Sequence, residues 1–283
     1  MKLATALRLG RVSNLPTVSS NVLAGLALAG YREQQASAVA VACCAASLLY
    51  VGGMFLNDAF DAEIDARERP ERPIPAGLAG RGEVFRYGAG LLLVGVVLAC
   101  LLSLASGMFA LATAATIVAY DIVHKRTGFA PLLMGLCRVG VYWLAAFVVV
   151  SPAAKQVALG SAVLCAYVLA LTYAAARENS TALVRIGPLV GLYAPALIVG
   201  TQLHSALGWV CLLVFVLWTV RNNLLVRTRQ PPQIRAGIGG LIAGIALLDA
   251  LWLAAMDAPA PVTAVALAAF AATLILQRFV AGT

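Results

Sequence analysis

The sequence predicts an all-α fold, a bundle of transmembrane helices. Of its 283 residues, 62% are hydrophobic and only 11% are charged, whereas about a quarter of the residues of a soluble domain are charged. The mean hydropathy is +0.92. Long apolar segments recur along the whole chain, and only helices or closed barrels satisfy every backbone polar group inside a bilayer. We therefore expect residues 1–283 to form a single integral membrane domain.

Ten apolar segments follow a short amphipathic lead-in at residues 1–11. We expect the spans at residues 12–30, 37–56, 85–106, 108–122, 131–150, 155–175, 184–203, 205–222, 237–256 and 261–279. The fourth and eighth segments are short for a crossing, which takes about 20 residues. The first segment carries Asn14, Asn21 and several hydroxyl side chains. Polar groups at membrane depth face the bundle interior, where they line a cavity or join helices.

The basic residues predict how the chain is oriented in the membrane. The net charge of +8 would suggest nucleic acid as a partner of a soluble protein, but the positive-inside rule explains it here. All but three of the 20 basic residues lie in the terminal segments or in every second connection, the exceptions being Arg32, Arg138 and Lys155. We expect both termini and these connections to be cytoplasmic, in the inner or plasma membrane if the protein is bacterial. The six cysteines lie in apolar runs without CxxC spacing and are expected to be buried hydrophobes.

The most polar stretch begins where the second apolar segment ends. It reads Asn57-Asp58-x-x-Asp61-x-Glu63-x-Asp65, and several arginines follow it. On a helix, the three aspartates fall on one narrow stripe with Asn57 at its edge, while Glu63 points elsewhere. Like charges on one stripe repel each other unless something binds them, and Mg²⁺ takes carboxylate oxygens while sharing its shell with substrate phosphates. The alternative is a solvated polar loop between two spans.

Two further connections carry residues of catalytic type. After the fourth span, Tyr120 and His124 share a helical face, as do Asp121 and Lys125. Lys125 is either a phosphate ligand or a member of a local ion pair with Asp121. After the sixth span, Tyr173 and Arg177 share a face, and Glu178 is the one acid.

Two charges lie within apolar segments. Arg138 lies about a third of the way along the fifth span, where a charge is costly unless it is paired or wetted. Its partner would be a bound anion or a carboxylate of the site; the alternative is a side chain that snorkels to the cytoplasmic interface. Asp249 in the ninth span has no evident basic partner within the membrane.

These residues together resemble a known family. The stretch Asn57-Asp58-x-x-Asp61-x-x-x-Asp65, followed by Arg72-Pro73-Ile74-Pro75, resembles the first aspartate-rich motif of the UbiA superfamily of intramembrane prenyltransferases. Tyr120-x-x-x-x-Lys125 is similar to the family's tyrosine–lysine element, with one more intervening residue. The resemblance covers about residues 8–222. It implies nine to ten transmembrane helices around a central cavity that opens laterally to lipid, and a transfer of a prenyl group from an isoprenyl diphosphate to an acceptor, often aromatic.

The resemblance also implies roles for the matched residues. Mg²⁺ would be bound by Asn57, Asp58, Asp61 and Asp65. The three aspartates and Lys125 would be the catalytic residues. The diphosphate would be bound by Arg72 and Lys125. The family's second aspartate-rich motif is reduced here to Arg177-Glu178-Asn179-Ser180. We expect Glu178 to be a metal ligand and Arg177 to bind diphosphate. Either Glu178 and Asn179 coordinate a second cation, or one cation suffices and Arg177 supplies the charge; the third possibility is that catalysis is lost.

The acceptor is not identified by the sequence. The candidates for contact with it, or for lining the cavity, are Asn14, Tyr120, Asp121, Arg138 and Tyr173. Two other functions fit the same residues. One is a terpene cyclase of the same fold, which would need no acceptor. The other is a non-catalytic protein that binds or transports prenyl lipids with a decayed site.

Overall fold

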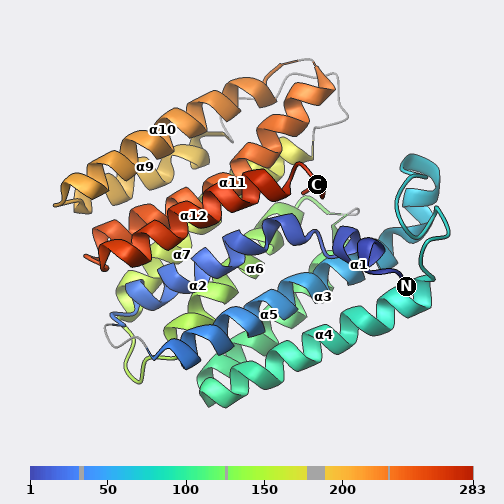
Figure 1. Cartoon of the computed structure of the whole chain (residues 1–283), viewed down its shortest axis with the longest axis horizontal. Helices are drawn as coiled ribbons and strands as arrows, with labels where there is room; N and C mark the ends of the chain where they lie inside the picture. The colour runs from blue at the N-terminus through green and yellow to red at the C-terminus, as the bar shows by residue number, and fades with distance from the viewer. Residues whose placement is uncertain (32–34, 125–126, 177–188, 229, 283) are drawn as a thin grey trace.

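The computed structural model describes residues 1–31, 35–124, 127–176, 189–228 and 230–282. The described chain forms a bundle of roughly parallel helices (Figure 1), which confirms the predicted all-α class. In chain order the helices are α1 (Leu3–Leu9), α2 (Leu15–Leu28), α3 (Ala36–Glu68), α4 (Arg81–Leu102), α5 (Leu104–Val123), α6 (Ala130–Ala146), α7 (Ala154–Ala175), α9 (Ala194–Val199), α10 (Ala206–Val226), α11 (Pro231–Ala255) and α12 (Ala260–Leu276). Within the described residues, α3, α4, α5, α7, α10 and α11 are long and apolar enough to cross a membrane, as expected of an integral membrane protein.

Two segments predicted to be short are of full length. Helix α5 begins at Leu104 and has 20 residues, because Ser103 is extended and its side chain accepts a hydrogen bond from the Ser106 N–H. This cap ends α4 inside an apolar run, which is why hydropathy placed the boundary four residues too late. Helix α10 has 21 residues and continues to Val226, and the Asn222 side chain bonds back to the Trp218 carbonyl at 2.8 Å.

The predicted span at 184–203 is not a single helix. Its first residues, 184–188, lie outside the described part of the chain. The rest consists of a 3₁₀ turn at Val190–Tyr193, the short helix α9 and a second 3₁₀ turn at Gly200–Gln202. Pro195 lies at the start of α9 and has no N–H to continue a helix through Gly191. A Cβ on Gly191 would lie 2.6 Å from the Ala166 carbonyl oxygen, so this segment packs closely on α7.

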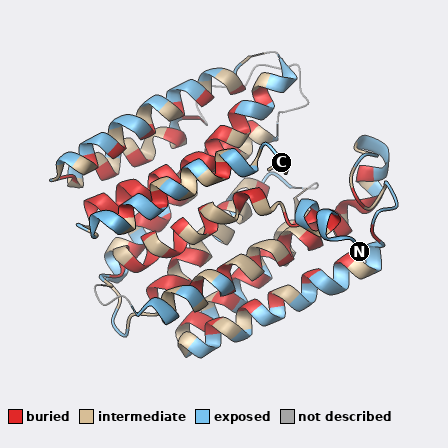
Figure 2. Ribbon diagram, viewed as in Figure 1, coloured by how far each residue is buried: buried red, intermediate tan, exposed pale blue. Residues whose placement is uncertain are grey.

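The core of the bundle lies around α2 and α11. Helix α11 is buried along nearly its whole length, whereas α4 exposes apolar side chains at the edge of the bundle (Figure 2). Helices α3 and α4 approach each other closely at Gly52 and Gly88. A Cβ added to Gly52 would lie only 2.9 Å from the Gly88 carbonyl oxygen. Small residues at such crossings let helices pack in lipid, where no hydrophobic effect drives them together.

The two terminal segments and the C-terminal end of α3 lie at the same end of the bundle. Helix α1, the end of α3 and the C-terminal segment lie toward the same end (Figure 1). Asn14 Nδ2 donates to the Gly282 carbonyl at 2.9 Å, which ties the C-terminal segment to the start of α2. This arrangement brings the acidic stretch of α3 next to both terminal segments.

Candidate active site

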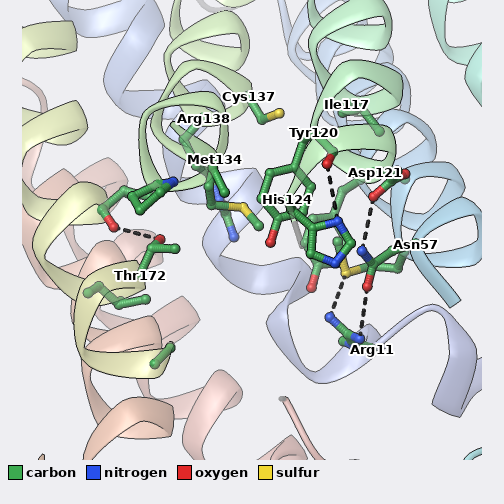
Figure 3. A pocket seen from close by; sticks show the side chains of 18 of the residues that line it. Arg11, Asn57, Ile117, Tyr120, Asp121, His124, Met134, Cys137, Arg138 and Thr172 are labelled. Atoms are coloured by element: carbon green, nitrogen blue, oxygen red, sulfur yellow. Dashed lines mark hydrogen bonds between the residues drawn. The ribbon is translucent and has the colours of Figure 1, made fainter. Parts of the chain in front are cut away.

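A cavity of about 970 Å³ lies among the helices next to the acidic stretch of α3 (Figure 3). Its polar lining includes Arg11, Asn57, Asp61, Arg72, Asp121 and His124. Its apolar lining includes Leu49, Ile117, Val141, Leu171, Ile242 and Ile245. We call the part of the cavity lined by these six polar residues its mouth. A charged mouth joined to an apolar body suits an amphiphilic ligand.

The acidic stretch is helical, as predicted, and it is buried, but its side chains divide between two faces. Asn57 and Asp61, four residues apart on α3, line the cavity. Asp58 and Asp65 are not among the residues that line it, and both are bound by arginines. All four side chains are at least nine-tenths buried. Glu63 points away and pairs with Arg81 at 2.8 Å, as its place on the helix predicted.

Two arginines hold the carboxylates that face away from the cavity. Arg72, in the connection after α3, donates from Nη1 to Asp65 Oδ2 at 2.8 Å and to Asp58 Oδ1 at 3.3 Å. Arg11 Nη2 donates to Asp58 Oδ1 at 3.2 Å and to Asn57 Oδ1 at 3.4 Å. Burial acts to lower the pKa of Arg11, but the Asp58 carboxylate and its neighbours outweigh burial, and the pKa is raised above its ordinary value. Arg11 and Arg72 both line the cavity.

Arg11 was not predicted as a site residue. It lies between α1 and a 3₁₀ turn, and its backbone is left-handed, with φ 42° and ψ 48°. This conformation is uncommon for any residue but glycine. In the sequence, Arg11 is one of several basic residues in an amphipathic lead-in, and nothing local marks it as the one that turns inward.

Helix α5 contributes a second polar face to the mouth. The rings of Tyr120 and His124 stack with their centres 4.8 Å apart, which confirms that they share a face. His124 Nε2 lies 3.2 Å from Asp61 Oδ2. Asp121 Oδ1 accepts a hydrogen bond from Asn57 Nδ2 at 3.0 Å. This bond turns the Asn57 oxygen toward Arg11 (Figure 3). Neither alternative for Lys125, a phosphate ligand or an ion pair with Asp121, can be followed in the structure, because Lys125 lies outside the described residues.

The remaining candidates divide into two groups. Asn14, Arg138 and Tyr173 line the cavity together with Tyr120 and Asp121, as predicted. The Arg138 guanidinium bonds to Asn21 Oδ1 at 2.9 Å and lies 5.5 Å from the centre of the Tyr50 ring. It therefore points to α2 and α3, not along α6 toward the interface. The second group is outside the described part of the chain and comprises Lys125, Arg177 and Glu178.

The mouth offers ligands of the type that Mg²⁺ takes. Within the described residues, no three acidic, histidine or cysteine side chains converge as a preformed metal site, and arginines pair with Asp58 and Asp65. Asn57 and Asp61, whose side chains carry oxygen ligands, nevertheless line the cavity. Mg²⁺ is usually held by one or two carboxylates together with substrate phosphates and water. The residues at the mouth therefore fit a metal that binds with a phosphorylated substrate.

Sequence comparison identifies relatives of this chain. The profile of the UbiA prenyltransferase family matches residues 18–232. The digeranylgeranylglyceryl phosphate synthase of Ignicoccus hospitalis is 36% identical over 127 residues, which are 45% of this chain and 41% of that protein. The enzyme of the same name from Thermococcus gammatolerans is 45% identical over 74 residues, 26% of this chain and 27% of that protein. The chain thus matches less than half the length of these curated relatives.

Solved structures share the fold over nearly the whole chain. A UbiA homologue from Aeropyrum pernix K1 in its apo form aligns with a TM-score of 0.62 and 16% identity, over 95% of this chain and 98% of that one. A UbiA homologue from Archaeoglobus fulgidus bound to GPP and Mg²⁺ aligns with a TM-score of 0.53 and 11% identity, over 97% of this chain and 99% of that one. At these identities the likeness concerns the fold.

Proposed function

The chain belongs to the UbiA prenyltransferase family, and on this premise we propose that it transfers a prenyl group from an isoprenyl diphosphate to an acceptor within the membrane. The observation that supports this proposal is one cavity in which an acidic and arginine-rich mouth adjoins an apolar body. The diphosphate fits the mouth and the hydrocarbon tail fits the body. The names of the curated relatives are those of prenyl-transferring enzymes, and the Archaeoglobus homologue binds GPP with Mg²⁺.

We assign the two faces of the acidic stretch to different tasks. Asn57 and Asp61 would hold Mg²⁺, which neutralises charge on the diphosphate when it is bound. Asp58 and Asp65 would act on the diphosphate through the arginines that they hold. We propose that Lys125 and Arg177 add diphosphate contacts and that Glu178 adds a metal ligand.

The proposed reaction follows from these charges. The bond between the allylic carbon and the diphosphate oxygen breaks, and its electron pair leaves with the diphosphate. Arg11 and Arg72 stabilise the negative charge as it develops on that oxygen. The apolar lining keeps water from the allylic cation. The nucleophilic atom of the acceptor attacks this cation and then loses its proton, for which Asp121 and the released diphosphate are the candidate bases. Tyr120, Asp121 and Tyr173 line the same cavity and are the candidates for contact with the acceptor near the mouth.

The test is Asp61→Ala, assayed in membranes with a labelled polyprenyl diphosphate and Mg²⁺. Loss of a group that stabilises transition-state charge lowers the rate on the order of 10²–10³-fold. Glu63→Ala is the matched control, because Glu63 lies on the same helix but is exposed and pairs with Arg81. Turnover that is unchanged by Asp61→Ala contradicts the proposal. A cyclase would release diphosphate without any acceptor, and a non-catalytic protein would bind the prenyl diphosphate without releasing diphosphate.

We also propose that the mouth faces the cytoplasm, in the inner or plasma membrane if the protein is bacterial, because the basic residues cluster in the connections at that end. Protease protection of a C-terminal tag in inside-out vesicles would contradict this orientation.

A further inference from the structure

Each of the two proposed metal ligands on α3 is contacted by a residue of α5. Asp121 Oδ1 accepts a hydrogen bond from Asn57 Nδ2 at 3.0 Å, and His124 Nε2 lies 3.2 Å from Asp61 Oδ2. The two ligands differ in one respect. Either oxygen of a carboxylate can bind a cation, whereas an amide can do so only through its single oxygen. The orientation of the Asn57 amide therefore decides whether Asn57 can be a ligand.

Two neighbours of Asn57 define this orientation. As a carboxylate, Asp121 only accepts hydrogen bonds, and the Arg11 guanidinium only donates them. The group that faces Asp121 is therefore the amide nitrogen, and the group that faces Arg11 is the oxygen, 3.4 Å from Nη2. Figure 3 shows Asn57 between these two side chains. The Asn57 oxygen is thus kept for a positively charged partner.

Of these two neighbours, Asp121 is the one that can hold the amide while substrate is bound. Arg11 also donates to Asp58 Oδ1 at 3.2 Å and to Met54 Sδ at 3.3 Å, and on the proposed function it stabilises the diphosphate. Asp121 Oδ1 bonds to Asn57, while Asp121 Oδ2 has no hydrogen-bond partner among the described residues. The contact between Asp121 and Asn57 therefore does not compete with the diphosphate.

Joining α3 to α5 does not explain why position 121 carries an acid. Asp121 is only 5% exposed, and a buried carboxylate with one hydrogen bond is costly. A neutral hydroxyl or amide could link the same helices at a lower cost. The two helices also pack directly at Gly53, where an added Cβ would lie 2.9 Å from Ile117 Cγ2. What a carboxylate adds is an acceptor that cannot donate.

We propose that Asp121 is a positioning residue for the metal, which orients the Asn57 amide so that its oxygen, and not its nitrogen, is presented to Mg²⁺. The inference rests on the proposed function, in which Asn57 and Asp61 hold Mg²⁺. Replacing a residue that orients a metal ligand lowers metal affinity or activity by about 10- to 100-fold. Because Asp121 acts through Asn57, its effect should disappear when the side chain at position 57 needs no orientation.

Mn²⁺ binding, followed by electron paramagnetic resonance, tests this proposal without requiring turnover. The full chain in phosphatidylcholine nanodiscs is titrated with Mn²⁺ in the presence of a thiodiphosphate analogue of geranylgeranyl diphosphate. We expect Asp121→Ala to weaken Mn²⁺ binding about 10- to 100-fold, and Asp121→Asn, which keeps an acceptor oxygen, to weaken it less. Thr116→Ala is the matched control on α5, because Thr116 bonds to the Ala112 carbonyl of its own helix and is not among the residues that line the cavity.

The decisive comparison is made in the Asn57→Asp background. Either orientation of an aspartate presents an oxygen to the metal, so Asp121→Asn and Asp121→Ala are expected to give Mn²⁺ affinities within about twofold of each other there. Both replacements remove the same charge, and their ratio reports the hydrogen bond alone. The double variant Asn57→Asp, Asp121→Asn keeps the net charge and exchanges donor and acceptor in the same bond. We therefore expect it to fold, and thermal unfolding checks this.

Three results would overturn the assignment. Equal losses with Asp121→Asn and Asp121→Ala in the wild-type background would mean that only the charge matters. An unchanged ratio of the two in the Asn57→Asp background would mean that Asp121 binds the metal itself or supports helix packing. Wild-type Mn²⁺ affinity in Asp121→Ala would leave Asp121 as a base or a link between helices. Failure of the proposed function gives a different result, in which Mn²⁺ binding is also insensitive to Asp61→Ala.

Discussion

We expect Asp65 to influence the diphosphate only through Arg72. Asp65 is 2% exposed, it is not among the residues that line the cavity, and its Oδ2 lies 2.8 Å from Arg72 Nη1. Arg72 lines the cavity. The informative perturbation is Asp65→Asn, which keeps the shape and one acceptor oxygen but removes the negative charge.

The magnitude follows from the hydrogen bonds that remain. A hydrogen bond to a charged partner contributes about 1.5–3 kcal/mol and a neutral one about 0.5–1.5 kcal/mol. Asp65→Asn leaves a hydrogen bond in which only Arg72 is charged, so the loss is about 1–1.5 kcal/mol, up to half of the upper end of the charged range, and Arg72 keeps its contact with Asp58 at 3.3 Å. Because 1.36 kcal/mol corresponds to a factor of ten, we expect KM for the prenyl diphosphate to rise about tenfold. Arg72→Met removes the ligand itself, with a loss on the order of 10²–10³ in kcat.

The assay is a double-mutant cycle on diphosphate release. If Asp65 acts through Arg72, Asp65→Asn has no further effect in an Arg72→Met background, and the coupling energy equals the single effect of about 1.4 kcal/mol. Glu63→Gln is the control, since Glu63 pairs with Arg81 at the same 2.8 Å but both side chains are largely exposed. Such surface pairs contribute about 0–1 kcal/mol, and kcat/KM should change less than about twofold.

Multiplicative effects of Asp65→Asn and Arg72→Met would refute this reasoning. They would mean that Asp65 contacts the substrate or its metal independently, as the spacing of the acidic stretch first indicated.

Two further changes test the bundle and the body of the cavity. Gly52→Val places a side chain against the Gly88 carbonyl, and such overpacking costs about 1–3 kcal/mol of folding free energy. Thermal unfolding in detergent should therefore show a lower Tm. An unchanged Tm would contradict the close crossing of α3 and α4. Ile242→Trp narrows the apolar body, so the longest prenyl diphosphate that is turned over should become shorter while the shortest substrate is unaffected; a wild-type pattern across a chain-length series would argue against tail binding there.

The helical class and the acidic stretch were predictable because both depend on local properties of the chain. Apolar runs of bilayer length specify helices whatever their partners are. The spacing of Asp58, Asp61 and Asp65 places them on one side of α3 in any fold that keeps the helix. The division of this side into a cavity face and an arginine face was not predictable, because it depends on where Arg11 and Arg72 lie in space.

The links across the membrane interior were hidden for a different reason. Asn21, Arg138 and Asp249 come from three helices and are separated by more than a hundred residues in sequence. The first apolar segment alone offers several hydroxyl and amide groups, and each could bond to either charge at the same depth. Periodicity reports which face of a helix a residue occupies, but it does not report which helix packs there.

The reduced second motif keeps one acid, Glu178, next to Arg177, so on the proposed function it offers at most one carboxylate to a metal. The described mouth already pairs Arg11 and Arg72 with Asp58 and Asp65, and both arginines line the cavity. On the proposed function, the arginines then provide stabilisation of the leaving group that a second metal would otherwise give. On the same proposal, Asp58 and Asp65 would hold these arginines in place, and this is the contribution that the cycle at Asp65 and Arg72 measures.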